Sequence, residues 1–214
     1  MKNTAFFMDF ELETESSVFF PRPETELLIE KALELLNREK PRNILDVGTG
    51  SGNIAISLTK HPSSSTIVAS DISHAALRVA GQNAKKYNVA GRIKFTRSDI
   101  FEDLPVHYRN FFDMIISNPP YVSLGDFYLL SGEVKNDPYS ALYGGKDGLE
   151  FFRRITSGAG LFLKRDGILL MEIGYDQARP VKEMLAVSSF HNIEIYKDYS
   201  GIDRIIKAER WKSW

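Results

Sequence analysis

Apolar, β-branched runs alternate with segments of helical period along most of the chain from Asn43 onward. This alternation predicts a parallel sheet with helices on both faces, because each parallel connection needs a crossover long enough to hold a helix. The seven runs expected to form strands are residues 43–48, 66–71, 93–99, 112–118, 167–173, 192–198 and 203–210. Only "YSGI" joins the last two runs, which is too short for a parallel crossover, so we expect the sheet to close with an antiparallel edge strand.

The segments between these runs carry apolar residues at helical spacing. We expect helices at residues 52–60, 73–87, 148–163 and 175–187, and one more that starts near Pro23, ahead of the first central strand. Before that helix, "FFMDFELE" and "SVFFP" alternate apolar and polar side chains around "TES", residues 14–16, which indicates a small hairpin. We therefore divide the chain into a hairpin segment, residues 1–22, and one α/β domain, residues 23–214.

Composition and charge narrow the classes of function. The 214 residues carry a formal net charge of -1 with lysine and arginine scattered along the chain, which disfavours extended nucleic-acid binding. The absence of cysteine excludes disulfides and thiolate chemistry, and no metal site is expected. The start of the sequence lacks the order of a secretory signal, and no apolar run reaches the roughly eighteen residues of a membrane span. These features favour a cytoplasmic protein without membrane contact.

A glycine-rich loop follows the first central strand. In "LDVGTGSGNIA", Gly48, Gly50 and Gly52 mark either a tight turn into a helix or a place where the backbone approaches a ligand. Asp71 and Asp99 are expected to end the next two strands, at the edge where open α/β sheets bind ligands. An acid about twenty residues beyond such a loop can bind the hydroxyls of a ribose. The combination therefore favours a ligand that contains adenosine.

The fourth central strand stops abruptly at "SNPPYV", residues 117–122. Proline has no backbone N–H and a fixed φ, so Pro119 and Pro120 end the hydrogen-bond ladder and stiffen the main chain. Asn118 and Tyr121 flank the two prolines. The motif thus places an amide and an aromatic ring at the predicted ligand-binding edge.

These motifs together resemble the class I S-adenosylmethionine-dependent methyltransferases, and "NPPY" is similar to the motif of enzymes that methylate planar nitrogens. Residues 19–208 carry "PRPETELL", "SNPPYV", "DPYSALYGGKDGLEFFRRI", "MEIGYDQ" and "KDYSGIDRII", which resemble the HemK/PrmC protein-glutamine methyltransferases. The resemblance implies a Rossmann-like fold, S-adenosylmethionine as cofactor and S-adenosylhomocysteine as product. It implies as substrate the glutamine in the GGQ motif of class I peptide chain release factors. We further expect a monomer.

The resemblance also implies a set of site residues. Those implied for the cofactor are Gly48, Thr49, Gly50, Ser51, Gly52, Asp71, Asp99, Ile100 and Asn118, with Ile100 or Phe101 packed on the adenine. Those implied for catalysis and for the acceptor are Asn118, Pro119, Pro120 and Tyr121, with Arg22 and Glu24 shaping the pocket. Asn118 and Pro119 would offer carbonyl oxygens to the amide hydrogens, and Tyr121 would lie flat against the amide. None of the four histidines lies in a matched motif, so no catalytic histidine is expected; they are His61, His74, His107 and His191.

Several alternatives stay open. "NPPY" equally suits a ribosomal-protein glutamine or the exocyclic amino group of a nucleic-acid base, and a non-catalytic cofactor-binding module is a further possibility. Members of the HemK/PrmC family usually carry a separate helical domain at the N-terminus that helps to dock the release factor. A chain of 214 residues has no room for that domain, which leaves the substrate more open than the chemistry.

Overall fold

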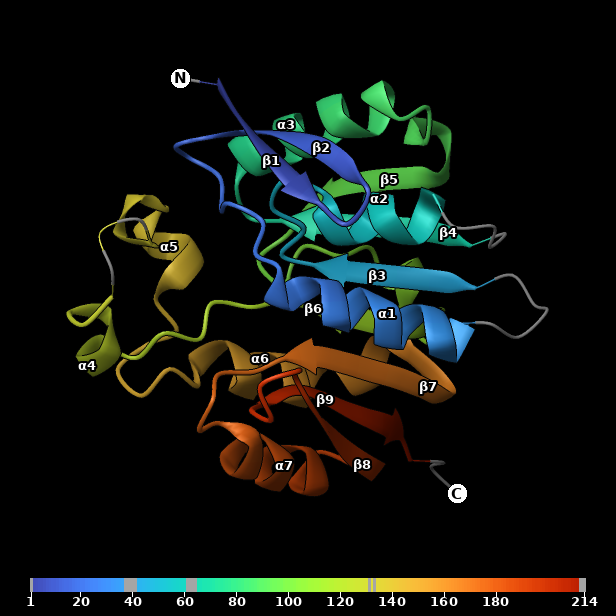
Figure 1. Ribbon diagram of the computed structural model, residues 1–214. Coiled ribbons are helices and arrows are strands. Elements are labelled where there is room, and N and C mark those ends of the chain that lie inside the picture. The colour runs from blue at the N-terminus through green and yellow to red at the C-terminus, as the bar shows by residue number, and fades with distance from the viewer. Residues whose placement is uncertain (1, 37–41, 61–64, 131, 133, 212–214) are drawn as a thin grey trace.

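A seven-stranded sheet in the order β5-β4-β3-β6-β7-β9-β8 forms the centre of the molecule (Figure 1). The computed structural model describes residues 2–36, 42–60, 65–130, 132 and 134–211. The strands are β3 (Asn43–Val47), β4 (Thr66–Asp71), β5 (Ile93–Arg97), β6 (Phe112–Ser117), β7 (Leu163–Glu172), β8 (Phe190–Lys197) and β9 (Asp203–Arg210). The pairs from β5 through β7 are parallel, so the predicted mostly parallel sheet is confirmed.

The last strand, β9, runs antiparallel to both of its neighbours, β7 and β8. Its predicted direction is therefore confirmed, whereas its predicted place at the edge is wrong, because β9 lies between β7 and β8. The central residues of β9, from Ile205 to Ala208, are all buried, while β8 has one buried residue, Phe190, and several exposed ones. The strand that can be covered on both faces thus takes the inner place, and the more polar strand forms the edge.

Helices cover both faces of the sheet, as predicted. One face carries α1 (Glu24–Leu36), α2 (Asn53–Lys60) and α3 (His74–Lys86), and the other carries α6 (Glu150–Phe162) and α7 (Ala178–Val187) (Figure 1). Successive strand residues point to opposite faces: Ile44 packs in the core with α1 and α2, and Leu45 packs in the core with α6 and α7. Two short helices that were not predicted, α4 (Leu124–Phe127) and α5 (Tyr139–Leu142), lie on a projection beside the sheet (Figure 1).

The N-terminal residues form the expected hairpin, but its turn is not where the sequence pattern placed it. Strands β1 (Lys2–Phe7) and β2 (Phe10–Glu15) pair antiparallel, so the turn is at Met8 and Asp9 and not at residues 14–16. Met8 adopts a φ of 51°, which suits a tight two-residue turn. The resulting register puts Phe7, Phe10 and Leu12 into the core that α1 and α2 cover. Burial of these side chains decides the register.

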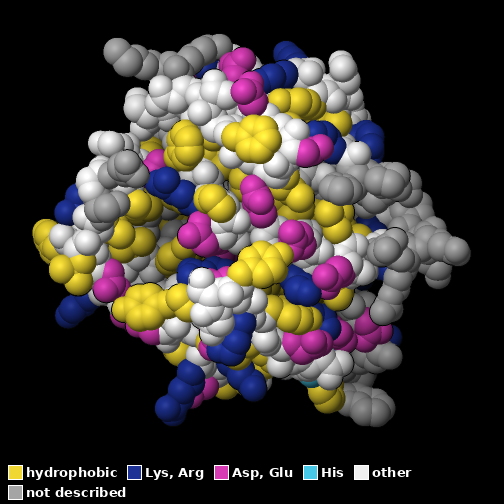
Figure 2. Space-filling view, viewed as in Figure 1, with side chains coloured by type: hydrophobic (Ala, Val, Ile, Leu, Met, Phe, Trp, Pro, Cys, Tyr) yellow, Lys and Arg dark blue, Asp and Glu magenta, His cyan; other side chains and the backbone are white. Residues whose placement is uncertain are grey.

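The carboxyl ends of β3, β4, β5 and β6 meet along one edge of the sheet because these strands are parallel and paired side by side. β5 ends at Arg97, two residues earlier than predicted, so Asp99 lies in the loop beyond the strand. Figure 2 shows acidic and basic side chains mixed over the described part of the face that carries α1. No helix within the described ranges is long and apolar enough to span a bilayer.

Candidate active site

A cavity of about 520 Å³ lies at the carboxyl edge of the sheet. Most of the residues predicted for the site line this cavity: Arg22, Glu24, Gly48, Thr49, Gly50, Ser51, Asp71, Asp99, Ile100, Asn118, Pro119, Pro120 and Tyr121. The structure therefore brings together the glycine loop, the two acids and the "NPPY" segment, which lie far apart in the sequence. Gly52 is not among the lining residues, because it faces α3, where an added Cβ would lie 3.1 Å from the Cβ of Ala80.

The glycine loop is shaped by the strand beside it. Gly48 and Gly50 adopt φ values of 75° and 56°, and a Cβ added to either would meet no atom within 4 Å, so the loop is open where side chains are missing. The amide N–H groups of Gly48 and Thr49 both donate to the carbonyl of Ser70 in β4. Beneath the loop, Asp46 accepts a hydrogen bond of 2.6 Å from the Thr49 hydroxyl, and burial raises the pKa of Asp46 to about 7.

Asp71 supports the glycine loop directly. Its Oδ2 accepts from the N–H of Gly50 at 2.9 Å, and its Oδ1 accepts from the N–H of Ser73 at 2.9 Å. Burial raises the pKa of Asp71, and these two backbone donors oppose that rise. A carboxylate has more acceptor positions than these two bonds occupy, so Asp71 can hold the loop and still accept from a ligand.

The loop after β5 settles which of two hydrophobic side chains faces the cavity. Ile100, at a φ of 53°, is buried and lines the cavity. Phe101 instead stacks on Phe162 of α6, with 5.1 Å between ring centroids, and is not a lining residue. Asp99 forms an ion pair of 2.9 Å with Arg154 of α6, which also lines the cavity. Of the two predicted candidates, only Ile100 is among the residues that line the cavity.

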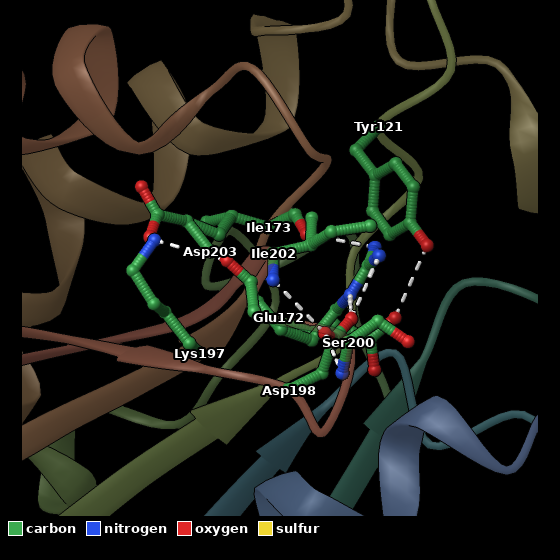
Figure 3. Close-up of polar contacts among 10 residues, drawn as sticks. Tyr121, Glu172, Ile173, Lys197, Asp198, Ser200, Ile202 and Asp203 are labelled. Carbon is green, nitrogen blue, oxygen red and sulfur yellow. Dashed lines mark hydrogen bonds and ion pairs between the residues drawn. The ribbon is translucent and has the colours of Figure 1, made fainter.

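The side chains of the "NPPY" segment are held from below by a buried acid. Asn118 Nδ2 donates to the hydroxyl of Thr25 at 2.9 Å, and that hydroxyl donates to Glu172 Oε2 at 2.8 Å. The Tyr121 hydroxyl donates to the other carboxylate oxygen, Glu172 Oε1, at 3.1 Å (Figure 3). Burial, followed by the negative charge of Glu172, raises the pKa of Tyr121, so the phenol keeps its proton. One carboxylate thus connects both flanks of the proline pair.

The main chain of the same segment is fixed by two further elements. Gln177 Nε2 donates to the carbonyl of Tyr121 at 2.9 Å. The N–H of Gly144 donates to the carbonyl of Val122 at 2.9 Å, and a Cβ on Gly144 would lie only 2.7 Å from the carbonyl oxygen of Pro120. Gly144 and Gly148 therefore allow close approach to the "NPPY" backbone itself. The segment is rigid because three separate stretches of chain hold it.

Sequence comparison places the chain among known proteins. Residues 22–129 match the family model of the methyltransferase small domain. The release factor glutamine methyltransferase of Clostridium acetobutylicum is 38% identical over 205 residues, which make up 95% of this chain and 72% of that protein. The chain belongs to the release factor glutamine methyltransferase family.

Other members of the release factor glutamine methyltransferase family are longer than the matched region. The Fusobacterium nucleatum member is 38% identical over 95% of this chain, and the match spans 57% of that protein. The solved structure of the release factor-specific protein-(glutamine-N5) methyltransferase from Alicyclobacillus acidocaldarius is 28% identical, with a TM-score of 0.54 over 90% of this chain and 94% of that one. A methyltransferase from Pyrococcus furiosus, 17% identical with a TM-score of 0.70 over 94% of this chain and 89% of that chain, shares the fold.

Two of the residues predicted for the pocket lie at the start of α1: Arg22 precedes the helix, and Glu24 is its first residue. Arg22 lines the cavity but is engaged by Asp137, with which it forms an ion pair, and its guanidinium lies 5.5 Å from the centre of the Phe19 ring. Asp137 also accepts from the N–H of Phe20 at 3.0 Å. Glu24 lines the same cavity. Arg22 therefore joins two segments around the cavity as well as bordering it.

Sequence reasoning missed several residues that border or support the site. These are Thr25, Asp137, Arg154, Glu172 and Arg204. Glu172 had a detectable signal, because an acid inside the apolar run "GILLMEI" must be buried and therefore needs partners. The described histidines, His74, His107 and His191, do not line the cavity, and His61 lies outside the described residues.

Proposed function

We propose that the chain transfers a methyl group from S-adenosylmethionine to the side-chain amide nitrogen of a protein glutamine, and that this glutamine belongs to the GGQ motif of a class I release factor. The observation that carries the proposal is the arrangement at Asn118. Its amide nitrogen is bonded to Thr25, which leaves its carbonyl oxygen for an acceptor in the same cavity that the glycine loop and Asp71 line. Membership of the family supports glutamine as the acceptor.

The residues present fit the cofactor. Gly48 and Gly50 leave open space where side chains would otherwise stand, which suits a ligand that lies against the backbone. Asp71 is backed by two N–H groups and retains free acceptor positions for ribose hydroxyls. Ile100 offers an apolar surface in the same cavity for a flat ring. When bound, S-adenosylmethionine would supply the methyl group from its sulfonium, and breaking the bond from the methyl carbon to sulfur would release the neutral thioether S-adenosylhomocysteine as the leaving group.

Asn118 and Pro119 are expected to make the amide nitrogen of the acceptor a better nucleophile. The amide nitrogen is a poor nucleophile because its lone pair is delocalised into the carbonyl. Hydrogen bonds from the two amide hydrogens to Asn118 Oδ1 and to the Pro119 carbonyl orient the nitrogen and stabilise the positive charge that grows on it. As the bond from nitrogen to the methyl carbon forms, the nitrogen becomes acidic and loses one proton to solvent. These steps need no strong general base.

Tyr121 and the stiffness of the segment contribute positioning. The Tyr121 ring can lie against the planar amide, and Glu172 and Gln177 hold that residue at its hydroxyl and its carbonyl. An acceptor array that is already rigid loses little conformational entropy when the glutamine binds. Most of the acceleration is then expected from alignment of the nitrogen with the methyl group.

The proposal is tested with labelled S-adenosylmethionine and purified acceptors. The acceptors are a class I release factor, its GGQ→GGA variant, ribosomal proteins and DNA. We expect label on the release factor and none on the variant. Equal labelling of the two factors would contradict the glutamine assignment. Label on ribosomal proteins or DNA alone would move the activity to one of the alternative acceptors.

A further inference from the structure

Glu172 lies at the end of β7 with almost no contact with solvent. Its residue is 1% exposed, and Thr25, which it contacts, is 0% exposed. The carboxylate connects to the acceptor side of the cavity by two routes. One runs through Thr25 to Asn118, and the other leads directly to the Tyr121 hydroxyl (Figure 3). A buried acid with both oxygens committed in this way acts through its partners, and those partners flank the proposed acceptor.

The direction of each hydrogen bond follows from the charge of Glu172. An ionised carboxylate only accepts, so the single protons of the Thr25 and Tyr121 hydroxyls must both point at it. The Thr25 oxygen can then only accept from Asn118, and it accepts from the NH₂ group. That choice fixes the amide of Asn118 with its carbonyl oxygen away from Thr25. A neutral residue at position 172 would lose this control over the polarity of the chain.

We propose that Glu172 is a positioning residue, which acts through Thr25 to fix the amide orientation of Asn118 and acts directly on the Tyr121 hydroxyl to fix its ring. The proposal rests on the proposed function, because a carbonyl oxygen of Asn118 turned toward the cavity matters for an acceptor that carries N–H groups. Thr25 and Glu172 thus help to arrange the acceptor site, although neither contacts the acceptor itself.

The charges around Glu172 bear on when it is ionised. Burial raises its pKa to about 7, and the charge of Glu24 on α1 acts in the same direction. The hydrogen bonds from Thr25 and Tyr121 and the positive charge of Arg204 on β9 oppose this rise. Above pH 7 the carboxylate form predominates and the bond directions are fixed. Below pH 7 a protonated Glu172 can itself donate to Thr25, which frees the Thr25 proton to bond the Asn118 carbonyl. Turnover should therefore decline as the pH falls through 7.

The test compares Glu172→Gln, Thr25→Val and Thr25→Ser with the unaltered protein. Glutamine keeps the size of Glu172 but introduces a donor, and valine removes the hydroxyl of Thr25 at similar volume. We expect turnover at pH 8 to fall about tenfold or more in Glu172→Gln and Thr25→Val, on the scale of disturbing one preorganised polar group. Thr25→Ser should restore most of what Thr25→Val loses. Cofactor affinity, measured by calorimetry, should change by less than about twofold in all three, since the losses belong to the acceptor side.

The pH profile of turnover separates positioning from a merely structural role. The decline of turnover below pH 7 should be absent in Glu172→Gln, which has no carboxyl group to titrate. Matched controls are Thr59→Val, which removes a buried hydroxyl that bonds the Ala55 carbonyl in α2, and Glu209→Gln, which alters an ion pair with Lys207. Both controls should keep the turnover and the pH profile of the unaltered protein. Melting temperatures confirm that each variant folds.

An activity-independent readout makes the outcome decisive. The side-chain NH₂ protons of Asn118, held by Thr25, should exchange with solvent more slowly in the unaltered protein than in Thr25→Val, as followed by NMR. Unchanged exchange in Thr25→Val would overturn the proposal, and so would full turnover in folded Thr25→Val and Glu172→Gln. If the unaltered protein methylates no glutamine, the proposed function fails, while the NMR comparison still decides whether Thr25 orients Asn118.

Discussion

At the scale of single residues, the proposed methyl transfer depends most on Asn118. Its NH₂ group is bonded to Thr25, so its role toward an acceptor rests on one carbonyl oxygen. We expect Asn118→Ala to lower turnover by roughly a hundredfold, the scale of losing one preorganised group, with near-normal affinity for S-adenosylmethionine. Single-turnover methylation and calorimetry measure the two quantities. Full turnover in a folded Asn118→Ala variant would refute the acceptor role.

The residues around Asn118 also show how far sequence reasoning reaches. Asn118 and Asp71 were predicted from their places at strand ends, since the carboxyl ends of parallel strands share one edge of a sheet. Thr25 and Glu172 were not predicted as site residues, although they bond each other across 147 positions of sequence. No local pattern encodes such a contact. It depends on how α1 packs beside β7, which only the assembled fold determines.

At the scale of elements, two segments that border the cavity are joined by one acid. Asp137, just before α5, forms the ion pair with Arg22 and accepts from the N–H of Phe20, so it links the chain before α1 to the projection that carries α4 and α5. Its side chain is only 7% exposed, so the pair is poorly screened by water. In the sequence, Asp137 stands out only as part of a longer motif. Its pairing with Arg22 could not be predicted, because the two residues are 115 positions apart.

Loss of this link should loosen the border of the cavity. We expect Asp137→Ala to speed the dissociation of S-adenosylhomocysteine several-fold, since both segments then move independently, with a smaller effect on the association rate. Stopped-flow displacement measures both rates. Glu183→Ala, which breaks the exposed pair with Arg179 on α7, is the matched control and should leave them unchanged. Equal dissociation rates in Asp137→Ala and the unaltered protein would show that the link does not retain the ligand.

Two elements whose details were predicted wrongly share a physical cause. The hairpin turn was predicted from local alternation of apolar and polar residues, and the place of β9 from the short link that precedes it. In the structure, burial against distant elements decides them: Phe7 and Phe10 enter the core beneath α1 and α2, and the buried centre of β9 is covered between β7 and β8. Local sequence therefore predicts that a strand exists and in which direction it runs. Its register and its neighbours in the sheet depend on packing against distant elements.

At the scale of the whole molecule, the acids whose pKa is raised by burial link stability to pH; they are Asp46, Glu172 and Asp71. Burial raises the pKa of Asp46 and of Glu172 to about 7, from ordinary values of 3.8 and 4.5. Between those ordinary values and 7 the folded protein holds more protons than the unfolded chain, so the free energy of unfolding falls as the pH rises. Acids with lowered pKa values act in the opposite direction, but only as they protonate at more acidic pH. These are Glu15, Asp147, Glu194, Asp198 and Glu209.

The melting temperature should therefore fall by several degrees between pH 5.5 and pH 8, at roughly 2–4 °C for each kcal/mol. Asp46→Asn removes one of these acids and should flatten this slope, whereas Glu183→Gln, at an exposed site, should not. An unaltered slope in Asp46→Asn would show that burial of this acid does not control the pH dependence. Because ionised Glu172 is disfavoured by burial yet fixes the direction of the Asn118 amide, turnover should rise over the same range in which stability falls.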